Sequence, residues 1–350
     1  MAWALPRREF ISRAQRIALA TPFLSLAGCG EDSAGDLISF DGATMGTTYS
    51  VKLAHPLQRI DPSILAHDIA GLLESVNQRM STYLASSELS RFNDASPERS
   101  TAISTDTLTV ISESKRLHRL TGGAFDPTVG PLVDLWGFGP EGGKQSVPSS
   151  RKIKAAAETI GFAKVESDDG TSSIHKQTPG TRLDLSGVAK GFAVDKVAEH
   201  LNAAGIEDYL VEVGGELRAS GHGVGGRPWR VGIEKPAPAY GAVQHVVHLG
   251  GESLATSGNY RIFFEQAGRR YSHIINPKTG HPVEHDLASV SVIAATTLEA
   301  DALSTSLLVL GAQAGMKLAE EQEIQAFFIV GGDGSFEELA SPAFNRRQRA

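Results

Sequence analysis

The stretch "LDLSGVAKGFAVDKV", residues 183–197, joins an extended segment to a helix, and the rest of the fold is organised around it. Residues 182–186 are predicted to be extended. The helix is predicted to begin at Ser186 or Gly187 and to end at Gly205, because glycine is favoured just after a helix C-terminus. The pattern therefore predicts a turn of small residues between two regular elements.

Two chemical interpretations of this turn remain open. In the first, Asp184 closes a strand, and the helix that carries Lys190 and Asp195 points its N–H groups and its positive dipole end at an anion. In the second, the small residues only allow close helix–sheet packing, and Lys190 and Asp195 form a surface pair. The stretch lacks the glycine spacing and the Lys-Ser/Thr ending of a P-loop, so the pattern alone is weak.

Helices and hairpin-connected strands follow one another along the rest of the chain without a repeat or a long linker. Further helices are predicted at residues 61–80, 106–120, 149–160 and 297–320. Strands are predicted at residues 209–213, 229–233, 244–249, 270–275, 287–294 and 326–330, with a hairpin turn at 168–170 and a glycine-rich loop at 214–226. This order predicts an α+β fold of mixed, largely antiparallel sheets packed with helices.

The composition is that of a globular chain. Its 350 residues are 41% hydrophobic and 21% charged, which is enough to bury the core of one large or two modest domains. The net charge of −7 and the lack of a basic stripe argue against a nucleic-acid partner.

The N-terminus has the pattern of an export signal. Arginines between residues 7 and 16 precede the apolar run 17–27, and Leu-Ala-Gly-Cys29 resembles a bacterial lipobox. The pattern predicts a signal peptide over residues 1–28, a lipidated Cys29 and a tether over 29–37. Arg-Arg at positions 7 and 8 also resembles a twin-arginine signal. The alternative is a buried cysteine behind an N-terminal helix.

Oxygen-bearing side chains share one face of the predicted helix 297–320. Asp301 and Thr305 are four residues apart, with Ser304 beside them. Carboxylate and hydroxyl oxygens suit Mg²⁺ and suit zinc poorly, so a magnesium site is one interpretation. A solvated or capping face is the other. Thr296 and Glu299 have the spacing of a capping box, which gives Glu299 a structural explanation.

Two further segments carry candidate side chains. His273 stands in an apolar strand, where it is either a general base or a hydrogen-bonded core histidine. Histidines 281 and 285 lack the spacing of a zinc site. Asp126 follows a predicted helix end in the sequence Gly-Ala-Phe-Asp, where it either accepts from a ligand or only caps a turn.

The stretch "DGATMGTTYS", residues 41–50, combines two glycines with four hydroxyl residues and lacks the alternation of a half-buried strand. We therefore expect that the backbone of this stretch is open to close approach by another group.

Seven motifs, in this order, resemble the ApbE-type flavin transferases, the FAD:protein FMN transferases, over about residues 38–335. They are Met-Gly-Thr-Thr-Tyr, Met-Ser-Thr-Tyr with Ser-Glu-Leu-Ser-Arg-Phe-Asn, Gly-Ala-Phe-Asp-Pro, Asp-Leu-Ser-Gly-Val-Ala-Lys-Gly, Gly-Gly-Glu, His-Ile-Ile-Asn-Pro-Lys-Thr-Gly and Glu-Ala-Asp-Ala-Leu-Ser-Thr. The resemblance implies an ApbE-like domain with a FAD cleft over residues 38–340, followed by a tail over 341–350. It also implies an enzyme that moves FMN from FAD to a Thr or Ser hydroxyl of an acceptor protein and releases AMP.

The resemblance also implies roles for individual residues. The FAD contacts would come from Met45, Tyr83, Ala124, Phe125, Asp126, Asp184, Lys190 and the backbone near Ile275. The Mg²⁺ ligands would be the carbonyl of Gly187 and the side chains of Asp301 and Thr305, with Ser304 close by. His273 would be the base that activates the acceptor hydroxyl.

The implied partners are acceptor flavoproteins with a motif like Asp-Gly-x-Ser/Thr-Gly-Ala-Thr, for example in membrane redox complexes. Residues 41–47 resemble that motif, which would make Thr47 a self-modification site, although the stretch is also implied to form a wall of the flavin pocket. The implied location is the periplasmic side of a bacterial membrane, through a lipid on Cys29. A competing interpretation is a flavin-scavenging lipoprotein that binds FAD, or hydrolyses it to FMN and AMP, without a protein acceptor.

Overall fold

The computed structural model describes residues 23–24, 37–55, 61–140, 145–168, 170–237, 241–332 and 335–349. The predicted lipidation site Cys29, the paired arginines at positions 7 and 8 and most of the predicted tether lie outside the described residues.

The described helices are α2 (Pro62–Met80), α3 (Glu88–Asp94), α4 (Thr105–Leu120), α5 (Gly130–Leu135), α6 (Ser150–Ala157), α7 (Ala189–Ala203), α8 (Thr297–Glu321) and α9 (Pro342–Arg349). The strands of the main sheet are β1 (Phe23–Leu24), β2 (Leu37–Thr44), β3 (Thr47–Ala54), β7 (Tyr209–Val213), β8 (Glu216–Ser220), β11 (Ser253–Gly258), β16 (Leu287–Ala294), β17 (Gln325–Gly332) and β18 (Ser335–Ala340). Shorter strands are β4 (Thr101–Ala102), β5 (Val165–Asp168), β6 (Ser173–Lys176), β9 (Trp229–Glu234), β10 (Val243–Leu249), β12 (Phe263–Gln266), β13 (Arg269–Ser272), β14 (Ile275–Asn276) and β15 (His281–Pro282).

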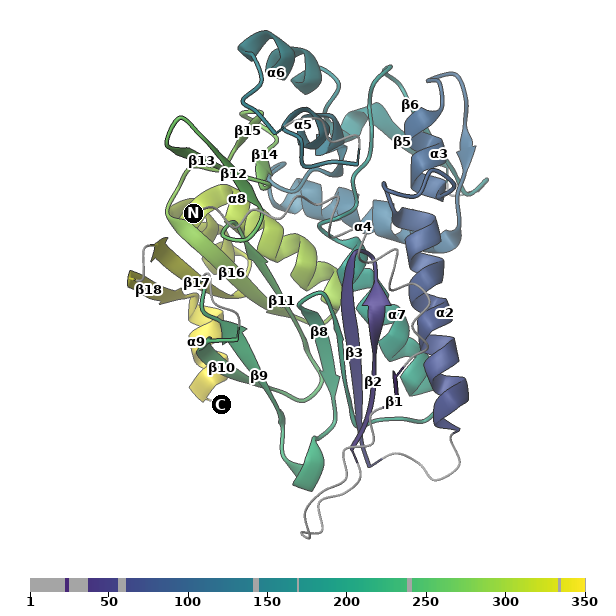
Figure 1. Ribbon diagram of the computed structural model, residues 1–350, viewed down its shortest axis with the longest axis vertical. Coiled ribbons are helices and arrows are strands. Elements are labelled where there is room, and N and C mark those ends of the chain that lie inside the picture. Colours follow the sequence, from purple (N-terminus) through teal and green to yellow (C-terminus); the bar gives the residue numbers. More distant parts are fainter. Residues whose placement is uncertain are drawn as a thin grey trace.

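The main sheet has nine described strands in the order β1-β2-β3-β7-β8-β11-β16-β17-β18, and each neighbouring pair is antiparallel. Helices α2, α7 and α8 pack on one face, as Figure 1 shows. The β9–β10 ribbon and α9 cover part of the other face, where Phe344 of α9 is buried. The fold is therefore α+β with antiparallel sheets, as the sequence predicts.

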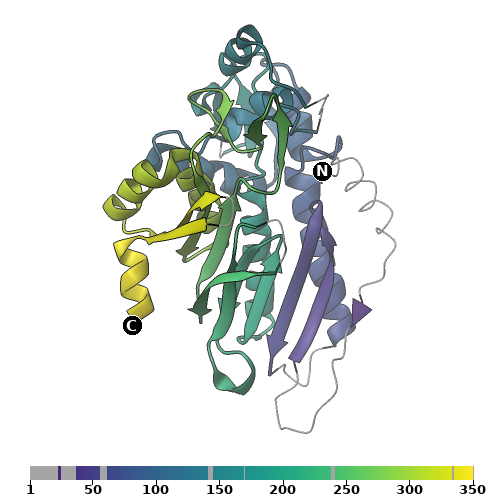
Figure 2. The ribbon, with the colours of Figure 1, turned by 60° about the vertical axis from the view of Figure 1, so that its left-hand side comes forward.

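Helices α3 to α6 and the short hairpins β12–β13 and β14–β15 gather beyond one end of the main sheet, at the top of both views (Figures 1 and 2). Part of this region has its own core, in which Trp136, Phe138 and Phe264 pack together with Ile275. Helices α3 and α4 instead pack buried side chains such as Phe92 and Ile111 into the main core. The junction between this upper part and the sheet is where the cavity described below lies.

Local sequence signals explain where the long helices begin. Asp61 accepts a hydrogen bond from the N–H of Ser63 at 2.8 Å, and Pro62 occupies the first helical position of α2, which confirms the predicted helix start. Thr296 caps α8 by accepting from the N–H of Glu299 at 3.3 Å. The Glu299 carboxylate forms an ion pair with Arg116 at 2.7 Å, so it ties α8 to α4.

Within the described ranges, α8 alone is long and apolar enough to cross a membrane. It packs against β11 and β16, and most of its side chains in the first four turns are buried. Its composition is that of a core helix.

Some predicted element boundaries are wrong, and hydrogen bonding explains the largest errors. Residues 181–185 belong to no strand, because side-chain and loop groups take their backbone hydrogen bonds: the N–H of Asp184 donates to the carbonyl of Pro127 at 2.7 Å. Helix α7 begins at Ala189, later than predicted, because the Asp184 carboxylate holds the N–H of Ser186 in a turn at 2.9 Å.

Three other predictions need correction. The glycine-rich region 214–226 contains strand β8, which pairs with β7 through a Gly-Gly turn. The predicted strand 270–275 is divided into β13 and β14, with His273 between them. Helix α6 ends at Ala157, earlier than predicted.

The stretch 41–50 is a β-hairpin. Strands β2 and β3 pair along their whole length, and Met45 and Gly46 form the turn between them with φ of 47° and 75°. Two consecutive positive φ angles match the twist of paired strands. The sequence of this hairpin shows no alternation of apolar and polar residues, because both strands carry small and hydroxyl residues near the turn.

Candidate active site

A cavity of about 490 Å³ lies at the junction of the main sheet and the upper part of the molecule. Its lining residues come from the start of β8, the end of β11, strand β9, the first turn of α7, the part of α8 from Asp301 to Val309, and the segments around residues 124–138 and 260–277. Most of the residues predicted from the sequence line it: Tyr83, Ala124, Phe125, Asp126, Asp184, Gly187, Lys190, His273, Ile275, Asp301 and Thr305. Met45 and Ser304 are not among the lining residues.

A buried cluster of charges forms one wall of the cavity. The ammonium of Lys190 lies 3.2 Å from Oε1 of Glu216 and 3.6 Å from Oδ2 of Asp301. Glu216 and Asp301 are only 4% and 2% exposed. Two carboxylates thus share one ammonium in a region with little water.

Burial alters the protonation of the cluster. Burial raises the pKa of Glu216 to about 8, against the attraction of Lys190 and with a further contribution from Asp301. Burial also raises the pKa of Asp301, although Lys190 opposes the shift. Burial lowers the pKa of Lys190, but the two carboxylates more than offset this and leave that pKa raised. The cluster is therefore suited to gain a further cation.

Close contact between α7 and α8 fixes the position of Asp301. A side chain on Gly191 would place its Cβ 2.3 Å from the carbonyl oxygen of Thr297 and 2.9 Å from Cβ of Asp301, so only glycine fits. The N–H of Gly191 donates to Oδ2 of Asp301 at 3.0 Å.

Asp195 strengthens the same helix contact. Its two carboxylate oxygens accept from the N–H groups of Thr297 and Leu298, both at 2.9 Å, and Oδ1 also pairs with Arg218 at 3.1 Å. These are unpaired donors of the first turn of α8, so Asp195 acts as a second cap. The interpretation of Lys190 and Asp195 as a surface pair is wrong, since the two residues have different partners.

Hydroxyl groups lie next to Asp301 on α8. Thr305 Oγ1 is 3.0 Å from Oγ of Ser257, and a Cβ on Gly187 would lie 3.4 Å from the same Thr305 oxygen. Ser304 is fully buried and bonds to Ser257 at 2.9 Å and to the carbonyl of Asp301 at 2.9 Å. Thr305 therefore faces the cavity with Gly187, whereas Ser304 lies behind it. Ser257, on β11, was not predicted, because a serine in a strand carries no sequence signal of function.

The oxygen set fits a hard divalent cation. Among the described residues, no group of three or more His, Cys, Asp or Glu side chains is arranged to hold a metal ion, so a cation here would also need hydroxyl, carbonyl or substrate oxygens. Asp301 and Thr305 instead offer a carboxylate and a hydroxyl near Gly187, and Glu216 has a buried oxygen, Oε2, with no partner among the described residues. Hard oxygen ligands beside two buried carboxyl groups that share one ammonium suit Mg²⁺.

His273 has a defined tautomer. Its Nδ1 lies 3.1 Å from the carbonyl oxygen of Ile262, and a carbonyl can only accept, so the hydrogen of the neutral ring is on Nδ1. Nε2 then carries the lone pair. The ring of Phe138 packs against His273 edge-on at 6.4 Å between centroids. His273 is thus a cavity residue that can accept a proton at Nε2.

The aspartates 126 and 184 hold the turns that shape the cavity. Asp126 accepts from the N–H of Thr128 at 2.9 Å, and Asp184 accepts from the N–H of Ser186 at 2.9 Å. Both carboxylates line the cavity as well, so the capping role and a ligand contact are compatible at the same residue.

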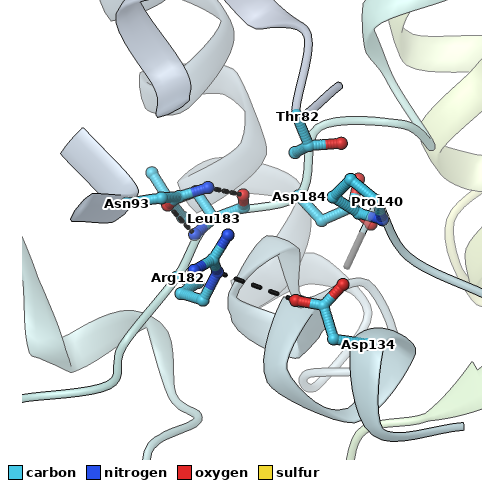
Figure 3. Close-up of a pocket in the computed structure, with 8 residues that line it drawn as sticks. Thr82, Asn93, Asp134, Pro140, Arg182, Leu183 and Asp184 are labelled. Carbon is cyan, nitrogen blue, oxygen red and sulfur yellow. Dashed lines mark hydrogen bonds and ion pairs between the residues drawn. The ribbon is translucent and has the colours of Figure 1, made fainter. Parts of the chain in front are cut away.

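A small pocket of about 10 Å³ lies beside Asp184, a residue that also lines the main cavity (Figure 3). The side chain of Asn93 donates to the carbonyl of Leu183 at 2.9 Å and accepts from its N–H at 2.8 Å. The Asn93 side chain thus makes the two backbone hydrogen bonds that a neighbouring strand would otherwise make with Leu183. Arg182 lies 3.7 Å from Asp134 in the same pocket, whose volume suits no more than a water molecule.

The cavity brings together an ammonium, buried carboxylates and a histidine, which is the kind of convergent polar lining that an α+β enzyme uses to hold a charged substrate. The sequence profile of the ApbE family matches residues 45–328. The FAD:protein FMN transferase of Vibrio cholerae serotype O1 is 45% identical over 94% of this chain and 97% of its own length. That of Haemophilus influenzae is 41% identical over 97% of this chain and 98% of its own length.

A solved structure agrees with these sequence matches. The flavin transferase ApbE from Vibrio cholerae superposes with a TM-score of 0.82 at 44% identity, over 89% of this chain and 99% of that one. The chain therefore belongs to the ApbE family.

Proposed function

We propose that the chain is a FAD:protein FMN transferase. It binds FAD in the 490 Å³ cavity and moves the FMN moiety to a Thr or Ser hydroxyl of an acceptor protein, with release of AMP. The observation that carries the proposal is that motifs far apart in the sequence supply residues to one cavity, where Lys190, Asp301 and His273 all line the wall.

The residues of the chain have distinct tasks in this reaction. The ammonium of Lys190 neutralises phosphate charge, and His273 takes the proton of the acceptor hydroxyl at Nε2. The hydroxyl oxygen then forms a bond to the FMN phosphorus, and the bond from that phosphorus to the AMP oxygen breaks. Asp301, Thr305 and the carbonyl of Gly187 would hold Mg²⁺, which supplies charge neutralisation at the pyrophosphate.

The test uses purified protein with FAD, Mg²⁺ and an acceptor protein that carries an Asp-Gly-x-Ser/Thr-Gly-Ala-Thr motif. We expect the acceptor to gain the mass of FMN and one AMP to be released for each acceptor modified. Release of FMN and AMP at the same rate without acceptor, and no gain in acceptor mass, would support the scavenging or hydrolysing alternative instead.

The proposed location is the periplasmic side of a bacterial membrane, with the chain anchored by a lipid on Cys29. It rests on the sequence pattern of residues 1–29. Cys29→Ser is expected to move the protein from the membrane fraction to the soluble fraction without changing FMN transfer. A membrane-bound Cys29→Ser protein would refute the lipid anchor.

A further inference from the structure

We infer that Glu216 is a positioning residue for Lys190, which keeps the ammonium at the cavity wall when a divalent cation occupies Asp301. The inference rests on the proposed function, since that function assigns a cation to Asp301. Neither the sequence motifs nor the family match gives Glu216 a task.

The backbone holds Glu216 firmly in place. It is the first residue of β8 and pairs with Val213 of β7 across the turn formed by Gly214 and Gly215. Both glycines have positive φ, 63° and 105°, and the N–H of Gly215 donates to the carboxylate of Glu212 at 2.6 Å. The turn therefore aims the Glu216 side chain at the first turn of α7.

Lys190 contacts three acceptors in this arrangement. Besides the two carboxylates, its Nζ donates to the carbonyl of Ser186 at 3.4 Å. A divalent cation on Asp301 would repel the ammonium and cancel the attraction that Asp301 exerts on it. Glu216 would then be the one remaining carboxylate within contact distance of Lys190, among the described residues.

The second carboxylate oxygen of Glu216 can accept the Lys190 ammonium when that ammonium leaves Asp301. Oε2 is buried and has no partner among the described residues, although Glu216 lines the cavity. A buried acceptor without a donor is unfavourable, so a donor that comes within reach of Oε2 is stabilised there. An ammonium displaced from Asp301 is such a donor, and the charged bond is stronger than a neutral one.

Without the carboxylate, Lys190 would remain on Asp301 and compete with the cation. Glu216→Gln keeps the side-chain volume and removes the carboxylate, whose ionised form is favoured by the positive charge of a nearby cation. We expect it to weaken Mn²⁺ binding, measured by electron paramagnetic resonance on protein without FAD, about tenfold. The Mg²⁺ concentration for half-maximal FMN transfer should rise by a similar factor.

The Lys190→Met variant distinguishes a residue that positions Lys190 from a residue that binds the cation directly. In Lys190→Met protein no ammonium competes, so Glu216→Gln should change Mn²⁺ affinity less than about threefold. Glu216→Asp keeps the charge and should restore Mn²⁺ affinity to within about threefold of wild type. Glu199→Gln is the matched control, since Glu199 pairs with Lys196 at 2.8 Å on the same helix and does not line the cavity.

The outcomes are distinguishable. A tenfold loss of Mn²⁺ affinity that persists in Lys190→Met protein would make Glu216 a cation ligand and overturn the inference, and so would an unchanged affinity in Glu216→Gln. If Glu216→Gln does not fold, Glu216→Asp replaces it in the Lys190→Met protein. A tenfold loss of Mn²⁺ affinity in that double variant would also overturn the inference. Wild-type protein that binds no Mn²⁺ and transfers FMN in chelator would instead refute the cation of the proposed function.

Discussion

The carboxylate of Asp195 on α7 accepts the N–H of Leu298 on α8 at 2.9 Å, so two helices that each carry a cavity residue are joined at the start of α8. The same carboxylate accepts from Thr297 and pairs with Arg218. Lys190 and Asp301 therefore keep a fixed separation through groups outside the cavity.

Asp195→Ala should lower the free energy of unfolding by roughly 2–4 kcal/mol, because it removes the acceptor for two helix N–H groups and leaves Arg218 without this partner. Urea denaturation followed by circular dichroism measures the change. Glu199→Ala, on the exposed side of the same helix, is the control. A loss below about 0.5 kcal/mol for Asp195→Ala would mean that the cap is not needed.

Asp301→Asn should reduce FMN transfer at least about 100-fold, since the amide cannot balance the charge of a divalent cation next to phosphate. Transfer is measured by the mass of the acceptor protein. Chelator should inactivate the wild type, and added Mg²⁺ should restore it. Full activity of Asp301→Asn at ordinary Mg²⁺ concentration would exclude Asp301 as a ligand.

His273→Ala should retain FAD affinity within about threefold while transfer falls by roughly 10²–10⁴, because a base acts on the acceptor hydroxyl and not on bound FAD. Flavin fluorescence reports binding, and acceptor mass reports transfer. Equal losses in both measurements would assign His273 to the shape of the cavity.

Stability of the protein without ligand should depend on pH through Glu216. Its pKa rises from 4.5 in the unfolded chain to about 8 in the folded one, so the folded state binds more protons between these values. The free energy of unfolding must then fall as pH rises through this interval, by up to about 1.4 kcal/mol per pH unit. Below pH 4.5 the contribution is complete.

Glu216→Gln cannot titrate, so the wild type should lose stability relative to this variant as pH rises from 5 to 8. Urea denaturation at each pH gives the comparison. A difference between the two proteins that does not change over this range would show that Glu216 is already ionised in the folded state.

Thr47→Ala should weaken FAD binding by about threefold to tenfold without removing covalent flavin. A Cβ on Gly214 would lie 2.8 Å from Cγ2 of Thr47 and 3.2 Å from Cδ of Lys190, so Thr47 borders the lysine that we assign to phosphate. Thr47 is not among the residues that line the cavity, so its hydroxyl is poorly placed to attack in line. An FMN adduct on Thr47 in the intact mass of wild-type protein would contradict this expectation.

The sequence predicts elements whose signals are local and misses contacts that only the tertiary structure creates. Asp61-Pro62 marks a helix start, and the strands at 209–213 and 287–294 have the predicted bounds. The segment before α7 resembles a strand in sequence, but Asn93, 90 positions away, takes the place of its neighbour. Nothing within a local window signals that exchange.

The site shows the same division. Asp301 and Thr305 are recognisable by helix spacing, whereas the two glycines before Glu216 suggest a turn and so place Glu216 in a predicted loop, where the structure has strand β8. Its importance depends on Lys190 and Asp301, which are distant in sequence. Met45 was predicted in the flavin wall, but the hairpin turn places it outside the cavity lining, packed against the main core.

The cavity wall has one more consequence, for the order in which the protein matures. Its lining begins at Tyr83 and is completed only by residues of α8 up to Val309. A nascent chain therefore cannot form the complete FAD cavity until nearly the whole domain has left the ribosome and strands β11 and β16 have paired in the main sheet. FAD that is present where the protein folds binds complete molecules and raises their free energy of unfolding by mass action. Truncated chains lack the full cavity, so FAD does not protect them from proteolysis.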